Sequence, residues 1–174
     1  MKINSPAGKA GTYAIQTATF GAPITAGGFT GNVVLADDGV APNADGCTPL
    51  VNGARSPATS SLIDRGTCTF VAKAQAAQAA GATGLIVANN VAAGLPGMGG
   101  TDPSITIPCV GISQADGNSI KANLGAGVNV TFILDPEPQG GRRQRRPGAD
   151  VRAESVPRAA RRCLTSTSHC RRTR

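Results

Sequence analysis

The sequence predicts an α/β fold with at most two short helices. From residue 62 onward, apolar strand-like segments alternate with helix-like segments in the order β–α–β–loop–β–α–β, and a β-rich region precedes them. Helix-like sequence with capping residues occurs at two places, 70–80 and 113–125. The connecting loops are rich in Gly, Pro, Asn and Asp, which are the common turn formers.

The first part of this region predicts a strand, a long loop and a tight turn. Residues 32–39, NVVLADDG, have the pattern of a short buried strand that ends in a turn. Residues 41–53, APNADGCTPLVNG, are dominated by turn formers and predict a loop. LIDRG, at 62–66, predicts a short apolar segment that leads into a tight turn. ARSPATSS, at 54–61, contains a proline and almost no apolar side chains, so we expect it to pair poorly in the sheet, with a short, frayed or absent strand before Leu62.

The first helix is predicted from its caps and its composition. Thr69 can accept an early helical N–H through its hydroxyl, so it is the expected N-cap. Residues 70–80, FVAKAQAAQAA, are good helix formers after the first two, and Gly81 stands where a C′ glycine belongs. The helix face that contains Ala74 and Ala77 is very small, so we expect the helix to lie close against a sheet.

The second half of this region predicts two more strands, which are separated by a long loop. A second helix and a closing strand follow them. Residues 84–90, GLIVANN, form a continuous apolar run with β-branched side chains, which favours a buried strand. Residues 91–104 are a Gly/Pro loop that is long for a compact domain. The strand-like segment 105–112 contains a proline, which predicts an edge strand or a bend. A helix is expected over 113–125, from the serine to the glycine, and a strand over 128–135.

Composition and charge exclude some classes of protein. No apolar run approaches the roughly 18 residues of a transmembrane helix. Residues 1–30 lack the continuous apolar segment of a signal peptide, so we expect either a protein that stays inside the cell or an internal piece of a longer chain.

The net charge of +7 comes from one end of the chain. Residues 1–139 contain six basic and eight acidic side chains, a balance of −2, whereas residues 140–174 contain eleven Arg and two acids, a balance of +9. This charge boundary separates a folded region from an Arg-rich tail that we expect to be disordered, because it cannot bury enough apolar surface to order itself.

Several motifs resemble the protease-associated (PA) domain family. They are D-R-G-x-C-x-F at 64–70, the Ala-rich helix, G-x-x-x-x-I-x-x-N-N at 81–90, and I-P-x-x-x-I-S-x-x-D-G at 107–117. The resemblance covers roughly residues 30–135, and the upstream GKAGTYAIQTATFG resembles the first strand of bacterial members.

The resemblance implies a small swivelling β/β/α domain that has no catalytic residues of its own. Domains of this family are usually inserted in or appended to secreted peptidases, such as subtilases and metallopeptidases, or form the luminal part of sorting receptors. They are thought to bind peptide segments or to gate access to a neighbouring active site. The implied organisation is a lead-in strand region at 1–30, a PA domain at 31–139 and the disordered tail at 140–174.

Cys47 and Cys68 are expected to form a disulfide, since family members with DGC and DRGTC use this pair. A disulfide would place the parent protein in an oxidising compartment, extracellular or periplasmic. The alternative, a nucleophilic Cys68, would need a nearby base, most often His. The single histidine, His169, lies in the Arg-rich tail.

Two further residue groups have both a functional and a structural interpretation. Asp64 and Arg65 could act as an acid and a base, but their place beside Gly66 favours an Asx-type turn in which the Asp64 carboxylate accepts backbone N–H groups, with Arg65 solvated or paired. Cys109 lies in a strand-like segment, where a small buried residue is expected.

The loop at 94–106 is the best candidate for binding a peptide or protein partner. Its accessible backbone and its soft apolar side chains come from Leu95, Pro96, Gly97, Met98, Gly99 and Gly100. The alternative is a solvated connector. No lysine follows the glycines, so a phosphate-binding loop is not favoured.

The sequence gives no support for a metal site or a cofactor. It contains neither HExxH nor C-x-x-C. The acidic residues that could hold calcium do not have the spacing of a recognised loop; they are Asp37, Asp38, Asp45 and Asp102.

The Arg-rich tail has two alternative explanations besides simple disorder. It could bind nucleic acid through phosphate, but it lacks aromatic residues for base stacking, so this function is not favoured. It could also be a frameshift product, because 141–156 can be encoded by nucleotides whose next frame reads GADNAGRVLMYAPNP, and 54–61 can likewise be read as PLAGDIVA.

We therefore expect a non-catalytic protein- or peptide-binding module, a fragment of a secreted bacterial protein. The alternative is the PA region of a secreted peptidase whose catalytic domain is absent from this chain. No catalytic residue, cofactor, metal or membrane contact is predicted.

Overall fold

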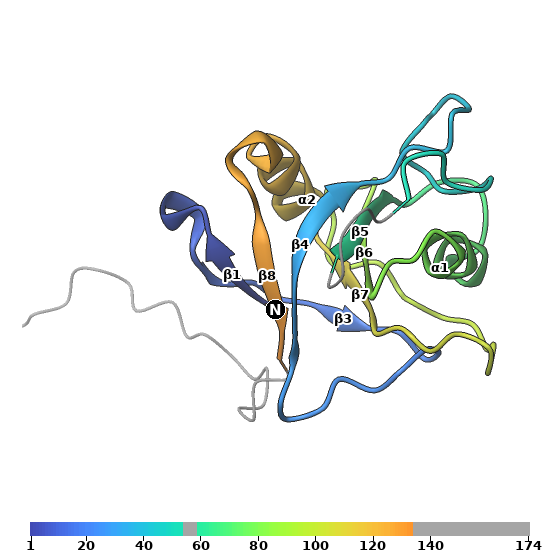
Figure 1. Cartoon of the computed structure of the whole chain (residues 1–174), viewed down its shortest axis with the longest axis horizontal. Coiled ribbons are helices and arrows are strands. Elements are labelled where there is room, and N and C mark those ends of the chain that lie inside the picture. The colour runs from blue at the N-terminus through green and yellow to red at the C-terminus, as the bar shows by residue number, and fades with distance from the viewer. Residues whose placement is uncertain (54–58, 134–174) are drawn as a thin grey trace, which may run out of the picture. The chain divides into compact units, whose positions relative to one another are not determined.

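A computed structural model describes residues 1–53 and 59–133 (Figure 1). Residues 54–58 and 134–174 lie outside the described ranges, and with them the predicted disordered tail at 140–174 and most of the segment at 54–61 that a frameshift would explain. The described residues all fall within one compact unit, so the lead-in region at 1–30 belongs to the same unit as the rest of the described domain.

Eight strands of the described ranges form one mixed sheet. They are β1 (Lys2–Ser5), β2 (Gly11–Thr12), β3 (Gln16–Thr17), β4 (Phe29–Leu35), β5 (Thr59–Asp64), β6 (Gly84–Ala88), β7 (Cys109–Ile112) and β8 (Asn129–Phe132). The order across the sheet is β2-β1-β8-β4-β5-β6-β7-β3. The four central strands from β4 to β7 run parallel, and β8 and β3 are antiparallel to their neighbours β4 and β7. The α/β fold class predicted from the sequence is therefore confirmed.

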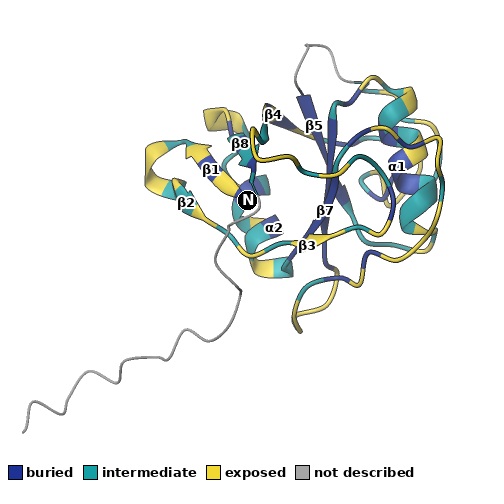
Figure 2. Ribbon diagram, turned by 90° about the horizontal axis from the view of Figure 1, so that it is seen from below, coloured by how far each residue is buried: buried dark blue, intermediate teal, exposed yellow. Residues whose placement is uncertain are grey.

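Within the described ranges, the helices α1 (Phe70–Ala79) and α2 (Gln114–Lys121) cover opposite faces of this sheet. Short 3₁₀ turns lie at Ala7–Lys9 and Leu124–Ala126. Because successive side chains of a strand point to opposite faces, the core has two layers. Leu62 contacts the layer that includes Ile120 of α2, and Ile63 contacts the layer that includes Ala74 and Ala77 of α1. Figure 2 shows the strands β5 and β7, coloured as buried, between α1 and α2.

The structure confirms the predicted caps and small face of the first helix. The Thr69 hydroxyl accepts a hydrogen bond from the Ala72 N–H at 3.2 Å. Gly81 follows the helix with a φ of 85°, a left-handed conformation that glycine adopts without steric cost. Ala74 and Ala77 are fully buried against the sheet, so their small side chains let the helix axis lie close to β6.

The expectation that residues 54–61 pair poorly is wrong for Thr59, Ser60 and Ser61, and 54–58 lie outside the described residues. These three residues begin β5, and they pair with β4 on one side and with β6 on the other. Backbone hydrogen bonds from two neighbouring parallel strands hold them, and such bonds do not depend on apolar side chains.

Two other sequence predictions need correction. The segment at 105–112 does not form an edge strand, because β7 is flanked by β6 and β3. The alternative prediction of a bend is confirmed, since the chain bends at Ile107, next to Pro108, and β7 begins at Cys109. The lead-in region supplies β3, and this long-range pairing cannot be inferred from local sequence. The second helix has the predicted N-cap, Ser113, but it ends at Lys121 and not at Gly125, which lies in the following 3₁₀ turn.

Candidate functional site

A disulfide joins Cys47 to Cys68, as the family resemblance implies. The two Cα atoms are 5.6 Å apart, and the residues are separated by 21 positions. Cys47 belongs to the long loop between β4 and β5, and Cys68 lies immediately before the N-cap of α1. The bond therefore fixes the loop to the start of the helix.

A buried lysine lies beneath the disulfide. The side chain of Lys73 is completely buried, and its ammonium donates to the backbone carbonyl of Asp45. The same Nζ is 3.3 Å from Cys68 Sγ and 3.6 Å from Cys47 Sγ. Burial lowers the pKa of Lys73, and the negative charges of Asp45, Asp38 and Asp64 partly offset this effect.

Two aspartates hold the backbone around Cys47. Asp38 accepts hydrogen bonds from the N–H groups of Val40, Cys47 and Thr48 at 3.2, 3.1 and 3.3 Å. Asp45 accepts a second bond from the Cys47 N–H at 3.1 Å. Burial alone would raise the pKa of Asp38, but the backbone hydrogen bonds outweigh it, and the pKa lies below its usual value.

Asp64 and Arg65 each contact a different partner, and the Asx-type turn predicted for Asp64 is not seen in the described residues. The Asp64 carboxylate accepts two bonds from Lys121 Nζ, at 2.5 and 2.6 Å. Arg65 Nη1 donates to Asn89 Oδ1 at 3.1 Å. Each residue that resembled part of a catalytic cluster therefore has a structural partner. Asp64 pairs with Lys121 of α2, Arg65 bonds Asn89 at the end of β6, and Cys68 is in the disulfide.

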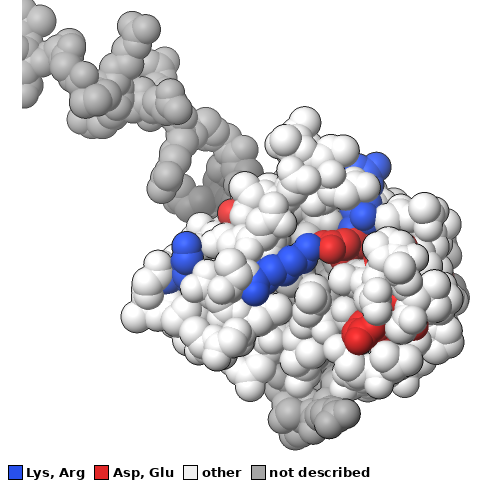
Figure 3. All heavy atoms as spheres, turned by 90° about the horizontal axis from the view of Figure 1, so that it is seen from above, with Lys and Arg blue, Asp and Glu red and all other residues white. Residues whose placement is uncertain are grey.

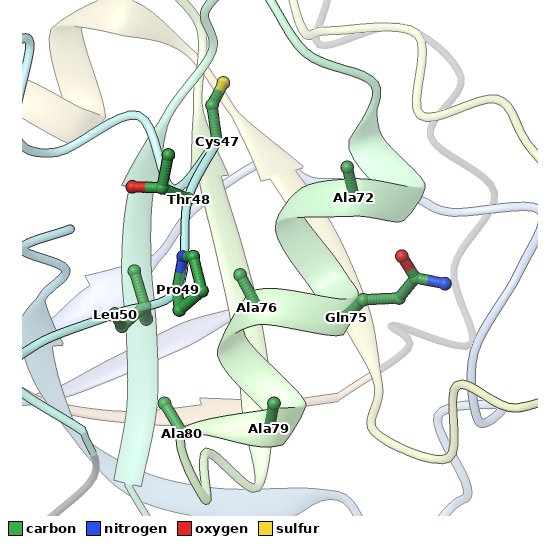
Figure 4. Close-up of a pocket in the computed structure, with 9 residues that line it drawn as sticks. All are labelled: Cys47, Thr48, Pro49, Leu50, Ala72, Gln75, Ala76, Ala79 and Ala80. Atoms are coloured by element: carbon green, nitrogen blue, oxygen red, sulfur yellow. The ribbon is translucent and has the colours of Figure 1, made fainter. Parts of the chain in front are cut away.

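An open groove lies beside the disulfide, between α1 and the segment 47–50 (Figure 4). Its volume is about 400 Å³. The residues that line it are mostly small and apolar: Cys47, Thr48, Pro49, Leu50, Ala72, Gln75, Ala76, Ala79 and Ala80. Three of the four alanines belong to α1, and Ala80 is the C-cap of this helix.

The loop predicted to bind partners has only part of the expected exposure. Met98 is buried in the core at 2% exposure, and Pro96 is also buried, so neither offers a free apolar contact. Leu95 is partly exposed, and the three loop glycines Gly97, Gly99 and Gly100 are exposed. A binding role for the loop stays a prediction.

Cys109 is the free cysteine of the described ranges, and it is buried in the layer beneath α1. Burial raises the pKa of its thiol to about 12, which keeps it protonated and unreactive at neutral pH. The small buried residue expected at this position is therefore confirmed.

The described part of the chain contains no group of three His, Cys, Asp or Glu residues arranged to hold a metal ion. Within the same ranges, no helix has the length and apolar content needed to cross a bilayer. On the face shown in Figure 3, most of the described surface is uncharged.

Sequence reasoning missed Lys73 and the groove. Lys73 is four residues before Ala77 and therefore on the buried face of the helix, and a lysine among alanines there is the signal that could have identified it. The groove had no local signal, because its walls come from segments about 25 residues apart in the sequence.

Residues 19–120 match the family model of the PA domain. The chain belongs to the PA domain family. This PA domain is similar to vacuolar-sorting receptor 7 of Arabidopsis thaliana, with 33% identity over 130 residues, which cover 68% of this chain and 20% of the receptor. It is also similar to leucine aminopeptidase 2 of Arthroderma otae, with 46% identity over 73 residues, which cover 41% of this chain and 14% of the enzyme.

Among solved structures, the zinc aminopeptidase BSAP from Bacillus subtilis has a similar fold. The TM-score is 0.57 at 27% identity, and the match covers 78% of this chain and 30% of that enzyme. The aminopeptidase from Aneurinibacillus sp. strain AM-1 is similar with a TM-score of 0.54 at 26% identity, over 75% of this chain and 28% of that enzyme. The chain thus spans about a third or less of the length of each of these relatives.

Proposed function

We propose that this PA domain is a non-catalytic module that binds protein or peptide segments and serves as an accessory to another part of a secreted protein. The observation that carries the proposal is the engagement of Asp64, Arg65 and Cys68 by structural partners. A nucleophile needs a free thiol or hydroxyl beside a base, and this arrangement leaves neither at the site that most resembles a catalytic cluster.

The similarity to known proteins also supports the accessory role. A sorting receptor and an aminopeptidase each contain a region similar to this chain, and their names describe different activities. A domain that occurs in proteins with different activities is better explained by a shared binding role than by a shared reaction.

A second candidate function is that of the PA region of a secreted peptidase, where the domain gates substrate access to a neighbouring catalytic domain. The similarity in fold to two aminopeptidases favours it. The disulfide favours an oxidising compartment for the parent protein under either candidate. A catalytic domain encoded beside this chain at the genomic locus would support the second candidate, and a locus without one would exclude it.

The absence of catalysis is tested by incubating the purified, oxidised full chain with casein and with leucine p-nitroanilide. We expect no turnover above the buffer control. Turnover that is abolished by Asp64→Asn or by Cys68→Ser would overturn the non-catalytic assignment.

Binding is tested by adding a tryptic digest of casein to the ¹⁵N-labelled full chain and recording amide spectra. We expect a localised set of amide shifts that saturates at high peptide concentration. A spectrum that stays unchanged at millimolar peptide contradicts a peptide-binding role.

A further inference from the structure

We propose that the Cys47–Cys68 disulfide is a redox switch, which a small thiol opens by attacking Cys47, and that Lys73 promotes this step by stabilising Cys68 as the departing thiolate. The switch controls how firmly the loop at 36–53 is held against the start of α1. This proposal goes beyond the proposed function and does not depend on it, because it concerns the chemistry of the disulfide and not the binding of a partner.

Both sulfurs of the disulfide lie beside groups that stabilise negative charge. The Lys73 ammonium is 3.3 Å from Cys68 Sγ and 3.6 Å from Cys47 Sγ. The backbone N–H of Cys68 donates to Cys47 Sγ at 3.3 Å. Cys68 also directly precedes Thr69, the N-cap of α1, where the helix has its positive end. A sulfur in a disulfide gains little from such neighbours, whereas a thiolate gains charge-assisted hydrogen bonds, so they favour the opened form.

The charge of Lys73 is closer to the sulfurs than to any described carboxylate. Its ammonium donates to the backbone carbonyl of Asp45, and none of the described carboxylates forms an ion pair with it. Three acidic side chains act on it from a greater distance, and they are Asp45, Asp38 and Asp64. The first two accept backbone N–H groups, and the third is paired with Lys121. Because electrostatic energy falls with distance, the ammonium in contact with the sulfurs outweighs these carboxylates in its effect on a thiolate.

The opening step is a thiol–disulfide exchange. The thiolate of a small thiol such as glutathione forms a bond to Cys47 Sγ, the Cys47–Cys68 bond breaks, and its electron pair leaves with Cys68. A second thiolate attacks the sulfur of the bound thiol, which releases Cys47 as a thiolate and leaves the two small thiols joined by a disulfide. Two small thiols are thus oxidised, the protein disulfide gains two electrons, and the two protons pass to the cysteines or to solvent.

Cys47 is the expected target of the attack. It is partly exposed and belongs to the lining of the open groove beside α1, so a small thiol can approach it. Cys68 is nearer to the Lys73 ammonium and is therefore the better leaving group.

Other bonds hold the loop near α1 when the disulfide is open. Asp38 accepts hydrogen bonds from the N–H groups of Cys47 and Thr48 at 3.1 and 3.3 Å. Lys73 joins the carbonyl of Asp45 to α1. The two sulfurs therefore stay close to one another after reduction, and the bond can form again. Opening removes the covalent link and leaves the domain folded, which distinguishes a switch from a cross-link whose loss unfolds the domain.

The first experiment measures how fast glutathione opens the disulfide at pH 7.5, by alkylation at intervals and mass mapping. It uses the oxidised full chain with Cys163→Ser and Cys170→Ser, so that these two thiols take no part in the exchange. We expect Lys73→Met to slow opening about tenfold, because the departing thiolate loses its cation. Lys121→Met, which removes a partly exposed lysine on α2, is the matched control and should leave the rate unchanged.

The direction of the change separates the proposal from a purely structural role. If Lys73 served only to hold Asp45, its loss would loosen the loop, expose the sulfurs and make opening faster. Unchanged or faster opening of Lys73→Met therefore overturns the proposal.

A second experiment needs no lysine variant, so it tests the proposal even if Lys73→Met does not fold. The oxidised chain is treated briefly with glutathione, quenched with N-ethylmaleimide and digested. We expect glutathione on Cys47 and maleimide on Cys68. In the fully reduced, folded chain, Cys68 should react with iodoacetamide at a lower pH than in 8 M urea, because the ammonium favours the thiolate. Glutathione on Cys68, or the same pH dependence in the folded and unfolded chains, overturns the role of Lys73.

Amide spectra of the ¹⁵N-labelled chain test whether the bond acts as a switch. Reduction should shift the amides of the loop at 36–53 and of the first turn of α1, and leave those of β6 and α2 in place. Oxidised glutathione should restore the original spectrum. Loss of dispersion throughout the spectrum would show that the disulfide is a structural cross-link, and a spectrum that does not change would show that opening has no conformational effect. Either result overturns the switch.

Discussion

Lys73 Nζ lies 3.3 Å from Cys68 Sγ and 3.6 Å from Cys47 Sγ, so one buried ammonium faces both sulfurs of the disulfide. The same group donates to the Asp45 carbonyl and lies near two aspartates that hold the loop. The helix, the disulfide and the loop wall of the groove therefore meet at a single side chain.

Lys73→Met should destabilise the domain by about 1–3 kcal/mol, because it leaves the buried Asp45 carbonyl without its donor. Urea unfolding at pH 7 measures the change. Lys121→Met is the matched control, since Lys121 bonds Asp64 in a partly exposed ion pair and its loss should cost below about 1 kcal/mol. Equal losses for the two variants would show that Lys73 has no special role.

Replacing both Cys47 and Cys68 by Ser should lower the free energy of unfolding by about 3 kcal/mol, as expected when a cross-link between residues 21 positions apart is removed. Mass spectrometry of a non-reduced digest of the unaltered chain should first show the two peptides linked. If both thiols of the folded chain react freely with an alkylating reagent, the disulfide assignment is wrong.

Asp38→Asn should destabilise the domain at pH 7 and have a smaller effect in acid. The folded-state pKa of Asp38 lies below its usual value of 3.8 because backbone N–H groups outweigh the effect of burial. Its stabilising contribution is therefore complete above pH 3.8 and is lost as the pH falls through the lower folded-state pKa. Thermal unfolding of the unaltered chain and of Asp38→Asn between pH 2.5 and 7 measures the difference. A difference that is constant over this range contradicts the assignment.

Ser60→Ala should stabilise the domain by about 1 kcal/mol. The Ser60 hydroxyl is buried in β5 and has no hydrogen-bond partner among the described residues, so its removal relieves a desolvation cost. Ser61→Ala, on the opposite face of the same strand, controls for the general effect of alanine in β5. A loss of stability specific to Ser60→Ala would show that the hydroxyl has a partner in solution.

Cys109 should resist iodoacetamide in the native chain at pH 8 and react in 8 M urea. Burial both shields the thiol and raises its pKa to about 12. Peptide mass mapping distinguishes it from the other cysteines. Rapid labelling of native Cys109 would mean that the layer beneath α1 opens readily.

Local chemistry was sufficient to predict the first helix and the strand that follows it. The Thr69 cap, the alanine face and Gly81 act within a few residues of one another, and the run at 84–88 is buried on both faces whichever strands flank it. The disulfide followed from family resemblance, because two cysteines 21 positions apart carry no information about pairing by themselves.

The sequence by itself determined the α/β class, the capped helices and the separation of an acidic region from a basic end, because propensity, capping and charge are properties of neighbouring residues. Only the tertiary structure decided that Ser60 lies within the sheet, that β3 covers β7, and that Lys73 reaches the disulfide. It also decided where the groove lies, since the alanines of α1 and the segment 47–50 become neighbours only when the disulfide and the sheet hold them together. These features depend on contacts between segments far apart in the chain, and such contacts form only when the whole sheet is assembled.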